Sequence, residues 1–384
     1  MKTLDELHLA SHAKMGRYNH KTLPSSYHDA CVEYQAMREN ALLVDYSHLS
    51  VVSVMGEDAW ALVNHWVSAD ISILRDEQAG YSLVLDKDGL IRGDVYILCV
   101  EEGYHLLSEN ITGTDIIADL HEILTQAEAL DIHETPEIAD RSHWGALLLE
   151  GPYAWEVLAE IYGFDVIGLP YHEFMQTPEA LILFRCGKHG EYAYLTLGEQ
   201  AALTALWQQL LESGEKFHLK TGGLDYQQRV RIENPCWDAA IYAPWSRNPV
   251  ELQLQWAIQY DKENFIGKSA VEAYSRNGVE RKLIGIVPLS ECGGIASHDR
   301  VLVDNRAVGQ IIKSVYSPAR QSFIALAMID EAYACADISG FTLETAQGNV
   351  AAMTQNLPFL YNLSLLVSPT EHSFIDETKP RRAG

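Results

Sequence analysis

The stretch that decides the fold runs from residue 42 to residue 100. It opens with LLVDYSHLSVVSVMG at 42–56, continues with EDAWALVNHWVSADI at 57–71, and ends with YSLVLD at 81–86 and DVYILCV at 94–100. Apolar runs broken by polar turns predict strand, turn and strand, and the helical spacing that follows predicts a helix. Between the last two runs, KDGLIRG contains Asp88-Gly89, which is typical of a hairpin turn.

Further along the chain the same order recurs. GALLLEGPYAWEVLAEIYG at 145–163 predicts a strand, a Gly-Pro turn and a helix, and helical spacing also covers 112–130 and 200–213. From about Arg281 the pattern changes to short apolar pieces broken by Gly, Asp and Asn, as in RVLVDNRAVGQIIKSVYS at 300–317. This change predicts a small all-β terminal domain that begins near the interrupting SRNG at 275–278.

Composition limits the classes of partner. The 384 residues carry 28 Lys and Arg against 53 Asp and Glu, a formal net charge of -25, which repels polyphosphates and anionic lipids. We therefore expect neither nucleic acid nor a membrane as partner. The six cysteines form no C-x-x-C pair and the N-terminus has no apolar export segment, so we expect reduced thiols and a cytoplasmic location.

Standard catalytic motifs do not occur in the sequence. There is no G-x-S-x-G, no P-loop and no G-x-G-x-x-G after a strand. His8 and His12 are spaced to share a helix face, but no acidic ligand is fixed near them, so we expect no metal site there and a solvated helix end. Asp94 stands at the mouth of an apolar strand, where a carboxylate can enter a pocket and be held rigidly, although most such residues are solvated.

Several segments together resemble the glycine-cleavage T-protein family. They begin with the run from Ala41 to Asp94 and continue, in the family's order, through LLLEGPYAWEVL at 147–158, VRIE at 230–233, KENFIGKSAV at 262–271, IIKSVYSPARQSFIALAMID at 311–330 and NLPF at 356–359. The resemblance spans almost the whole chain. It implies an α+β fold of three lobes, a cloverleaf, with a folate-binding region of two interleaved lobes at 1–278 and a C-terminal β-barrel at 279–384.

The same resemblance implies tetrahydrofolate as cofactor. Asp94 falls on an aspartate that lies near the pterin, where it would act as general base and orienting group for N5, the atom that gains the one-carbon unit. Tyr81 falls on a tyrosine that lines the pterin pocket and would supply a stacking face and a hydroxyl.

Two departures from the family pattern affect the expected folate contacts. Where the family carries G-Y-T-G-E-x-G-F-E, this chain has CGKHGEYAYL at 186–195, so Glu191 or Tyr192 is the candidate to replace the pterin-binding glutamate. In LDYQQRVRIE at 224–233, Gln227 replaces an arginine expected to hold the folate tail, and Arg229 or Arg231 can take its place, with a surface ion pair as the alternative.

An acidic chain that binds an anionic folate needs a local basic lining. The candidates are Arg229, Arg231, Lys262, Lys268, Lys313 and Arg320. For a cationic donor, such as a sulfonium or a quaternary ammonium, the aromatic cluster Trp237, Tyr242 and Trp245 is the candidate contact, with ordinary packing as the alternative.

The sequence favours one function and leaves two alternatives open. The favoured function is transfer of a methyl group from a small donor to N5 of tetrahydrofolate, because YNHKTLP at 18–24 resembles the folate-dependent dimethylsulfoniopropionate demethylase branch. The second is the aminomethyl transfer of glycine cleavage, with a lipoyl carrier protein as partner. The third is a non-catalytic folate-binding accessory protein, like the iron-sulfur assembly members of the superfamily, although Phe265 stands where that reading requires a cysteine.

Overall fold

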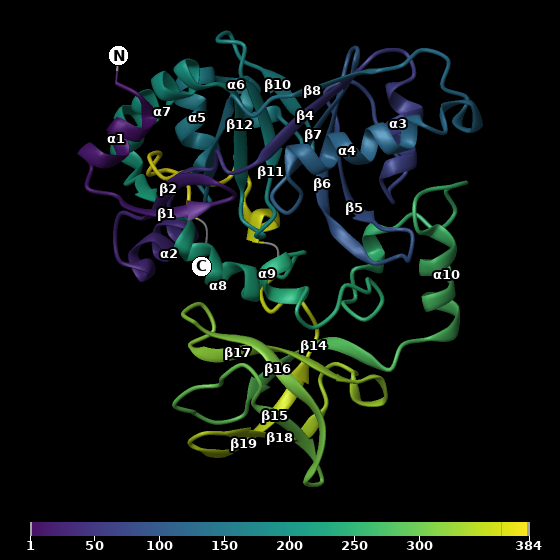
Figure 1. Ribbon diagram of the computed structural model, residues 1–384. Helices are drawn as coiled ribbons and strands as arrows, with labels where there is room; N and C mark the ends of the chain where they lie inside the picture. The colour runs from purple at the N-terminus through teal and green to yellow at the C-terminus, as the bar shows by residue number, and fades with distance from the viewer. Residues whose placement is uncertain (1, 362, 382–384) are drawn as a thin grey trace.

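Two β-sheets lie face to face between two layers of helices, and a β-barrel lies beneath them (Figure 1). The computed structural model describes residues 2–361 and 363–381. One apolar core joins the facing sides of the two sheets, with Leu148 and Leu195 from one sheet and Leu98 and Leu107 from the other. Within the described ranges, no helix is long and apolar enough to cross a membrane.

The five-stranded sheet has the order β5-β6-β7-β4-β8, and helices α3 and α4 cover its outer face. The elements of this half are β4 (Ser50–Met55), α3 (Ala59–Trp66), β5 (Ala79–Leu85), β6 (Ile91–Val100), β7 (Gly103–Ser108), α4 (Gly113–Leu124) and β8 (Glu137–Asp140). The predicted hairpin at 81–100 is confirmed, since β5 and β6 pair antiparallel.

The six-stranded sheet has the order β10-β11-β12-β9-β3-β13, and helices α1, α5 and α7 cover its outer face. Its elements, with the helices and the hairpin β1-β2 beside it, are α1 (Leu4–Ala10), β1 (Lys14–Tyr18), β2 (Lys21–Ser26), α2 (Ala30–Glu39), β3 (Leu42–Asp45), β9 (Trp144–Glu150), α5 (Ala154–Tyr162), α6 (Phe164–Gly168), β10 (Phe174–Gln176), β11 (Ile182–Cys186), β12 (Ala193–Glu199), α7 (Gln200–Gly214) and β13 (Lys220–Gly222). Because β3 lies in this sheet and β4 in the other, the two lobes interleave in sequence.

The strands read as continuous apolar runs because both faces of each sheet are buried. In β9, Leu147 and Leu149 face the helices, whereas Leu148 faces the other sheet. In β6, Val95 and Ile97 face α3 and α4, whereas Tyr96 and Leu98 face the core between the sheets. This period of two decides which polar side chains enter the space between the lobes.

The C-terminal barrel is closed, with the order β14-β17-β16-β15-β18-β19. Its strands are β14 (Arg281–Pro288), β15 (Arg300–Val303), β16 (Arg306–Ser317), β17 (Ser322–Asp330), β18 (Ser339–Thr345) and β19 (Gly348–Gln355). The connection to it carries α8 (Gln227–Glu233), α9 (Ala239–Tyr242) and α10 (Lys268–Asn277). Short 3-10 helices are η1 (Ala127–Leu130), η2 (Glu215–Phe217), η3 (Leu224–Tyr226), η4 (Gln255–Ala257), η5 (Glu331–Tyr333) and η6 (Leu363–Leu366). The all-β terminal domain is thus confirmed, and a boundary at 278/279 stays our proposal.

His8 does not lie at a solvated helix end, which corrects the prediction from sequence. Its ring is fully buried between α1 and the six-stranded sheet, and its Nε2 lies 2.9 Å from Asp45 Oδ2. Tyr27 Oη lies 2.5 Å from the other ring nitrogen, and Trp207 packs against the ring edge. His8 therefore helps to hold α1 against β3 and α7. Among the described residues, no group of three or more His, Cys, Asp or Glu side chains is arranged to hold a metal ion.

Lys262 has a structural role rather than a place in a folate lining. Its Nζ donates to the carbonyl oxygens of Val67 at 2.7 Å and Ala69 at 2.8 Å, and also to that of Asn64. These carbonyls lie at the end of α3 and just after it, where a helix leaves acceptors unsatisfied. Burial lowers the pKa of Lys262 to about 7.

We expect Lys262→Met to lower the free energy of unfolding by about 2–4 kcal/mol, because it leaves buried carbonyls without a donor. Chemical denaturation followed by circular dichroism measures this. Lys2→Met, at an exposed position, is the control. Equal midpoints for the Lys262→Met variant and this control would show that the three hydrogen bonds contribute nothing.

Candidate active site

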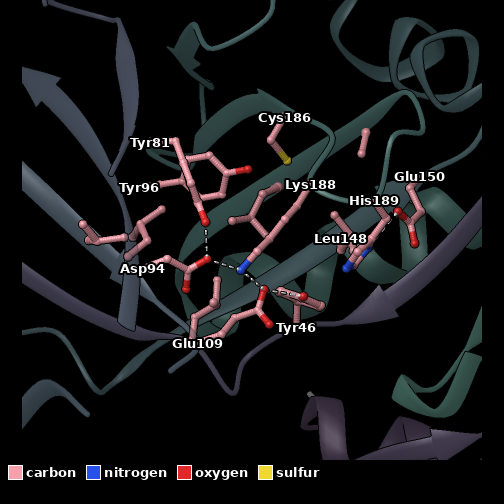
Figure 2. Close-up of a pocket in the computed structure, with 15 residues that line it drawn as sticks. Tyr46, Tyr81, Asp94, Tyr96, Glu109, Leu148, Glu150, Cys186, Lys188 and His189 are labelled. Carbon is pink, nitrogen blue, oxygen red and sulfur yellow. Dashed lines mark hydrogen bonds and ion pairs between the residues drawn. The ribbon is translucent and has the colours of Figure 1, made fainter. Parts of the chain in front are cut away.

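Asp94 lies between the two sheets, on β6. The alternation along this strand directs its side chain away from α3 and α4, and the residue is only 2% exposed. Its Oδ2 accepts a hydrogen bond from Tyr81 Oη at 2.8 Å and forms an ion pair with Lys188 Nζ, also at 2.8 Å. Its Oδ1 accepts one from Asn110 Nδ2, also at 2.8 Å. The carboxylate is therefore held in one orientation by two hydrogen bonds and an ion pair, and Figure 2 shows the contacts with Tyr81 and Lys188.

Tyr81 belongs to a group of aromatic rings beside this carboxylate. Tyr96 meets its edge at 5.4 Å between ring centroids, and Trp256 stacks on its face at 5.7 Å. Burial and then the nearby Asp94 carboxylate raise the pKa of Tyr81 well above its ordinary value, so its hydroxyl remains a donor. Trp256 is 67% exposed, so an aromatic stack leads from solvent to Asp94.

Lys188 reaches Asp94 from the opposite sheet. It lies at the tip of the β11-β12 hairpin, in the turn CGKHGE, where the Gly190 N–H donates to the Gly187 carbonyl at 2.9 Å. Gly190 has a φ of 81°, which favours glycine, and the two central residues of such a turn are displayed at its tip. Those residues are Lys188 and His189, and both line the pocket.

Glu109 is the second carboxylate near Lys188. It follows β7, accepts from Tyr46 Oη at 2.7 Å and lies 3.4 Å from Lys188 Nζ. Arg231 on α8 binds its other oxygen at 2.5 Å. Burial alone would raise the pKa of Glu109, but Arg231 and Lys188 hold it well below its usual range. Asp94, Lys188, Glu109 and Arg231 therefore form a chain of ion pairs with alternating charge. This chain connects both lobes to α8.

Glu150 is a third carboxylate in the pocket, at the end of β9. It has the same parity as Leu148, so it faces the space between the sheets. Tyr226 Oη donates to one of its oxygens, and His189 Nδ1 lies 3.7 Å from the other. His189 Nε2 is buried without a hydrogen-bond partner among the described residues. A ligand with N–H donors and an acceptor would find matching groups here.

Two cavities meet at Glu109. The inner pocket, lined by Asp94, Tyr81, Lys188 and Glu150 among others, has a volume of about 30 Å³, which holds only about two water molecules. The outer cleft has about 810 Å³, within the range of cofactor sites, and lies between the lobes, α8, α9 and the barrel. Arg17, Arg231 and Lys313 contribute positive charge to its lining.

Two family models match the chain, one over the two lobes and one over the barrel. The model of the GCVT N-terminal domain matches residues 4–262, and that of the glycine cleavage T-protein C-terminal barrel domain matches residues 281–360. The chain belongs to the glycine-cleavage T-protein family. As a member of the T-protein family, it is a tetrahydrofolate-dependent one-carbon transferase.

Individual relatives of the T-protein family are distant but cover most of the chain. An aminomethyltransferase of Caldanaerobacter subterraneus subsp. tengcongensis is 27% identical over 86% of this chain and 88% of its own length. One of Alkaliphilus oremlandii is 28% identical over 79% and 82%. The crystal structure of glycine cleavage system aminomethyltransferase T from Bartonella henselae has a TM-score of 0.78 at 22% identity, over 94% of this chain and 97% of that one. This last likeness shows that the fold is shared.

The structure brings Asp94, Tyr81 and Arg231 of the predicted site together, but not Glu191 or Tyr192. Tyr192 belongs to the apolar cluster on the helix side of the six-stranded sheet, because its parity is opposite to that of Ala193 and Leu195. Glu191 is buried against Arg38 of α2, at 2.7 Å. Neither residue lines the inner pocket, where Asp94 and Tyr81 lie.

Of the other residues predicted to contact the folate or the donor, some line the cleft and others do not. Arg229 lies against α2, with its guanidinium 5.1 Å from the centre of the Tyr34 ring, and does not line the cleft. Trp237 and Tyr242 are buried and stack on each other in the core, so the alternative of ordinary packing holds for them. Trp245 does line the cleft, where it packs against His298.

Of the other basic candidates, Lys313 lines the cleft, and the rest contact backbone carbonyls. Arg320 donates to the Phe359 carbonyl at 2.8 Å, and Lys268 donates to that of Lys262. Sequence reasoning missed Lys188, Glu109 and Glu150. The strand parity that places Leu148 could have found Glu150, whereas a contact between two lobes, such as that of Lys188, leaves no local signal.

Proposed function

We propose that this chain transfers a one-carbon unit from an aminomethyl donor to N5 of tetrahydrofolate. The observation that carries the proposal is Asp94, a buried carboxylate oriented by Tyr81, Asn110 and Lys188 where the inner pocket meets the wide cleft. When bound, tetrahydrofolate supplies the nucleophilic nitrogen N5. Asp94 would accept the N5–H hydrogen bond and orient that nitrogen toward the donor carbon.

The residues of the two cavities fit a reduced folate. Its pterin ring carries adjacent N–H donors, which suit the Glu150 carboxylate, and further hydrogen-bonding groups for the unpartnered Nε2 of His189. Its anionic tail suits Arg231 and Lys313 in the cleft. Since the inner pocket holds only about 30 Å³, side chains that line it have to move for a ring to enter. We assign the pterin contact to Glu150 in place of Glu191 and Tyr192.

The aminomethyl donor is supported by the names of the relatives, which are aminomethyltransferases over most of this chain's length. We therefore propose a lipoyl carrier protein as partner, because a tethered arm can bring the donor carbon through the cleft to Asp94.

A methyl donor is the second candidate. Tyr18 and Asn19, from the segment that resembles the dimethylsulfoniopropionate demethylase branch, line the cleft itself. Asn19 Nδ2 donates to the Glu109 carbonyl at 2.7 Å, so this segment helps to shape the region where a donor would bind. The curated relatives named above do not include that branch, and the methyl reading rests on this local feature.

The two candidates differ in their products. The purified chain is incubated with tetrahydrofolate and either an aminomethyl-lipoyl carrier or a panel of sulfonium, betaine, sarcosine and aryl methyl ether donors. We expect ammonia and methylenetetrahydrofolate from the carrier. Formation of 5-methyltetrahydrofolate from one of the small donors, without turnover of the carrier, would replace this proposal with the methyl candidate.

Glu150→Gln tests the assigned pterin contact. We expect the Kd for tetrahydrofolate to rise by about 10- to 100-fold, the effect of losing a hydrogen bond to a charged group. Isothermal titration calorimetry measures it.

Glu191→Gln is the matched variant, because it changes the other candidate carboxylate in the same way. We expect it to lower the thermal midpoint, since Arg38 loses an ionic partner, and to leave the Kd close to that of the unmodified chain. The reverse result would return the pterin contact to Glu191.

A further inference from the structure

Lys188 places a cation where the mechanism proposed above has only Asp94 to handle protons. Among the described residues that line the inner pocket, Lys188 is the only lysine or arginine. Its side chain is 11% exposed, and its Nζ lies 2.8 Å from Asp94 Oδ2 and 3.4 Å from Glu109 Oε1. Figure 2 shows the ammonium group between the two carboxylates.

Both oxygens of Asp94 are occupied in this arrangement. They accept hydrogen bonds from Tyr81 and Asn110, and one of them pairs with the ammonium group of Lys188. Burial alone would lower the pKa of Lys188, but Asp94 and then Glu109 raise it above its ordinary value, so the lysine enters the reaction protonated. The proton available in the pocket therefore lies on Lys188.

We propose that Lys188 is the general acid of this site, giving its proton to the atom that leaves the one-carbon unit. The proposal rests on the proposed function, since it concerns the same transfer to N5. It extends that function by assigning the second proton-transfer group and by limiting the class of donor.

The step balances without a further reactant. The bond from N5 to the donor carbon forms as the bond from that carbon to the leaving atom breaks, and the electron pair of the broken bond stays on the leaving atom. Lys188 delivers its proton there, and its neutral amine then takes up the proton that N5 loses. One proton thus passes from N5 to the leaving atom, and Lys188 ends protonated. With an aminomethyl donor, a second exchange of the same kind follows: N10 bonds the same carbon, the remaining leaving group departs with the electron pair, and the proton that N10 loses balances the one that this group takes up. An N5–H group that bonds Asp94 also displaces the ammonium from it, which makes the ammonium a better acid.

This assignment selects donors whose leaving atom departs with a proton. Amine, thiol and hydroxyl leaving groups need one, whereas a sulfonium leaves as a neutral thioether and a quaternary ammonium as a neutral amine. A cationic donor would also be repelled by Lys188. The negative charges of Asp94 and Glu109 do not offset this repulsion, because they are balanced by Lys188 and Arg231. Of the three aromatic residues expected to hold such a cation, Trp237 and Tyr242 line neither cavity, and only Trp245 lines the cleft.

The test uses the full chain with Lys188→Met and Lys188→Arg. Arginine keeps a positive charge beside Asp94 but does not release a proton in the physiological range. Single-turnover transfer to tetrahydrofolate is measured with the donors that the unmodified chain accepts, ordered by the basicity of the leaving atom. We expect both variants to lose about 10²- to 10⁴-fold on the most basic leaving groups, and progressively less as basicity falls.

A readout apart from turnover separates an acid from a charge partner. The Kd for tetrahydrofolate, from titration calorimetry, is expected to be unchanged in Lys188→Arg. Equal losses across the donors, full activity of Lys188→Arg, or a loss explained by weaker folate binding would each overturn the assignment of the acid. Absence of transfer by the unmodified chain from every donor would instead reject the proposed function itself, and the acid with it.

Discussion

Replacing Asp94 with asparagine is expected to lower kcat for one-carbon transfer by about 10²- to 10⁴-fold, because N5–H of the folate loses the carboxylate that accepts its hydrogen bond and orients it. The substitution keeps the size of the side chain but removes its charge. It also turns an acceptor into an N–H donor, which then faces Tyr81, Lys188 or Asn110, all of which are donors to Asp94. We expect the variant to fold but to turn over slowly. Circular dichroism measures its folding, and product formation measures its kcat.

Asp45→Asn is the matched control for this prediction. Asp45 is also buried and also bonded to a cation-forming side chain, since its Oδ2 lies 2.9 Å from His8 Nε2. It lines neither the inner pocket nor the cleft. Its variant is expected to lose some stability and keep transfer activity. Transfer by Asp94→Asn at the rate of this control would show that Asp94 only supports the pocket.

The difference between the two aspartates also shows what the sequence predicted well. Two apolar runs with Asp88-Gly89 between them predicted the hairpin that carries Asp94, and the alternation within β6 turns that residue toward the other sheet. Tyr81, on the paired strand, follows from the same register. Features of one strand pair are local, so a pattern of residues is enough to predict them.

The alternation of side chains along a strand also explains why the position of Tyr192 was hard to predict. Tyr192 and Ala193 are neighbours, yet one faces the helices and the other the pocket, so an uncertainty of one residue reverses the assignment. Lys188 escaped notice for another reason. Its partners Asp94 and Glu109 come from the opposite sheet, and no spacing along the chain encodes a contact between lobes.

The second large effect is expected at Arg38, a site of stability rather than of transfer. Arg38 on α2 binds Glu191 at 2.7 Å and Glu233 at 2.6 Å, and both carboxylates are fully buried. Glu233 in turn accepts from Tyr34 Oη at 2.7 Å and from Ser317 Oγ of the barrel at 2.5 Å. The network thus joins α2, the β11-β12 hairpin, α8 and the barrel.

Arg38→Met is expected to lower the free energy of unfolding by about 3–5 kcal/mol, because removing one partner leaves buried carboxylates without their cation. Chemical denaturation measures this, and Arg300→Met is the control, since it breaks an exposed ion pair with Glu344. A deficit equal to that of the control would mean that the buried pair contributes no more than a surface one.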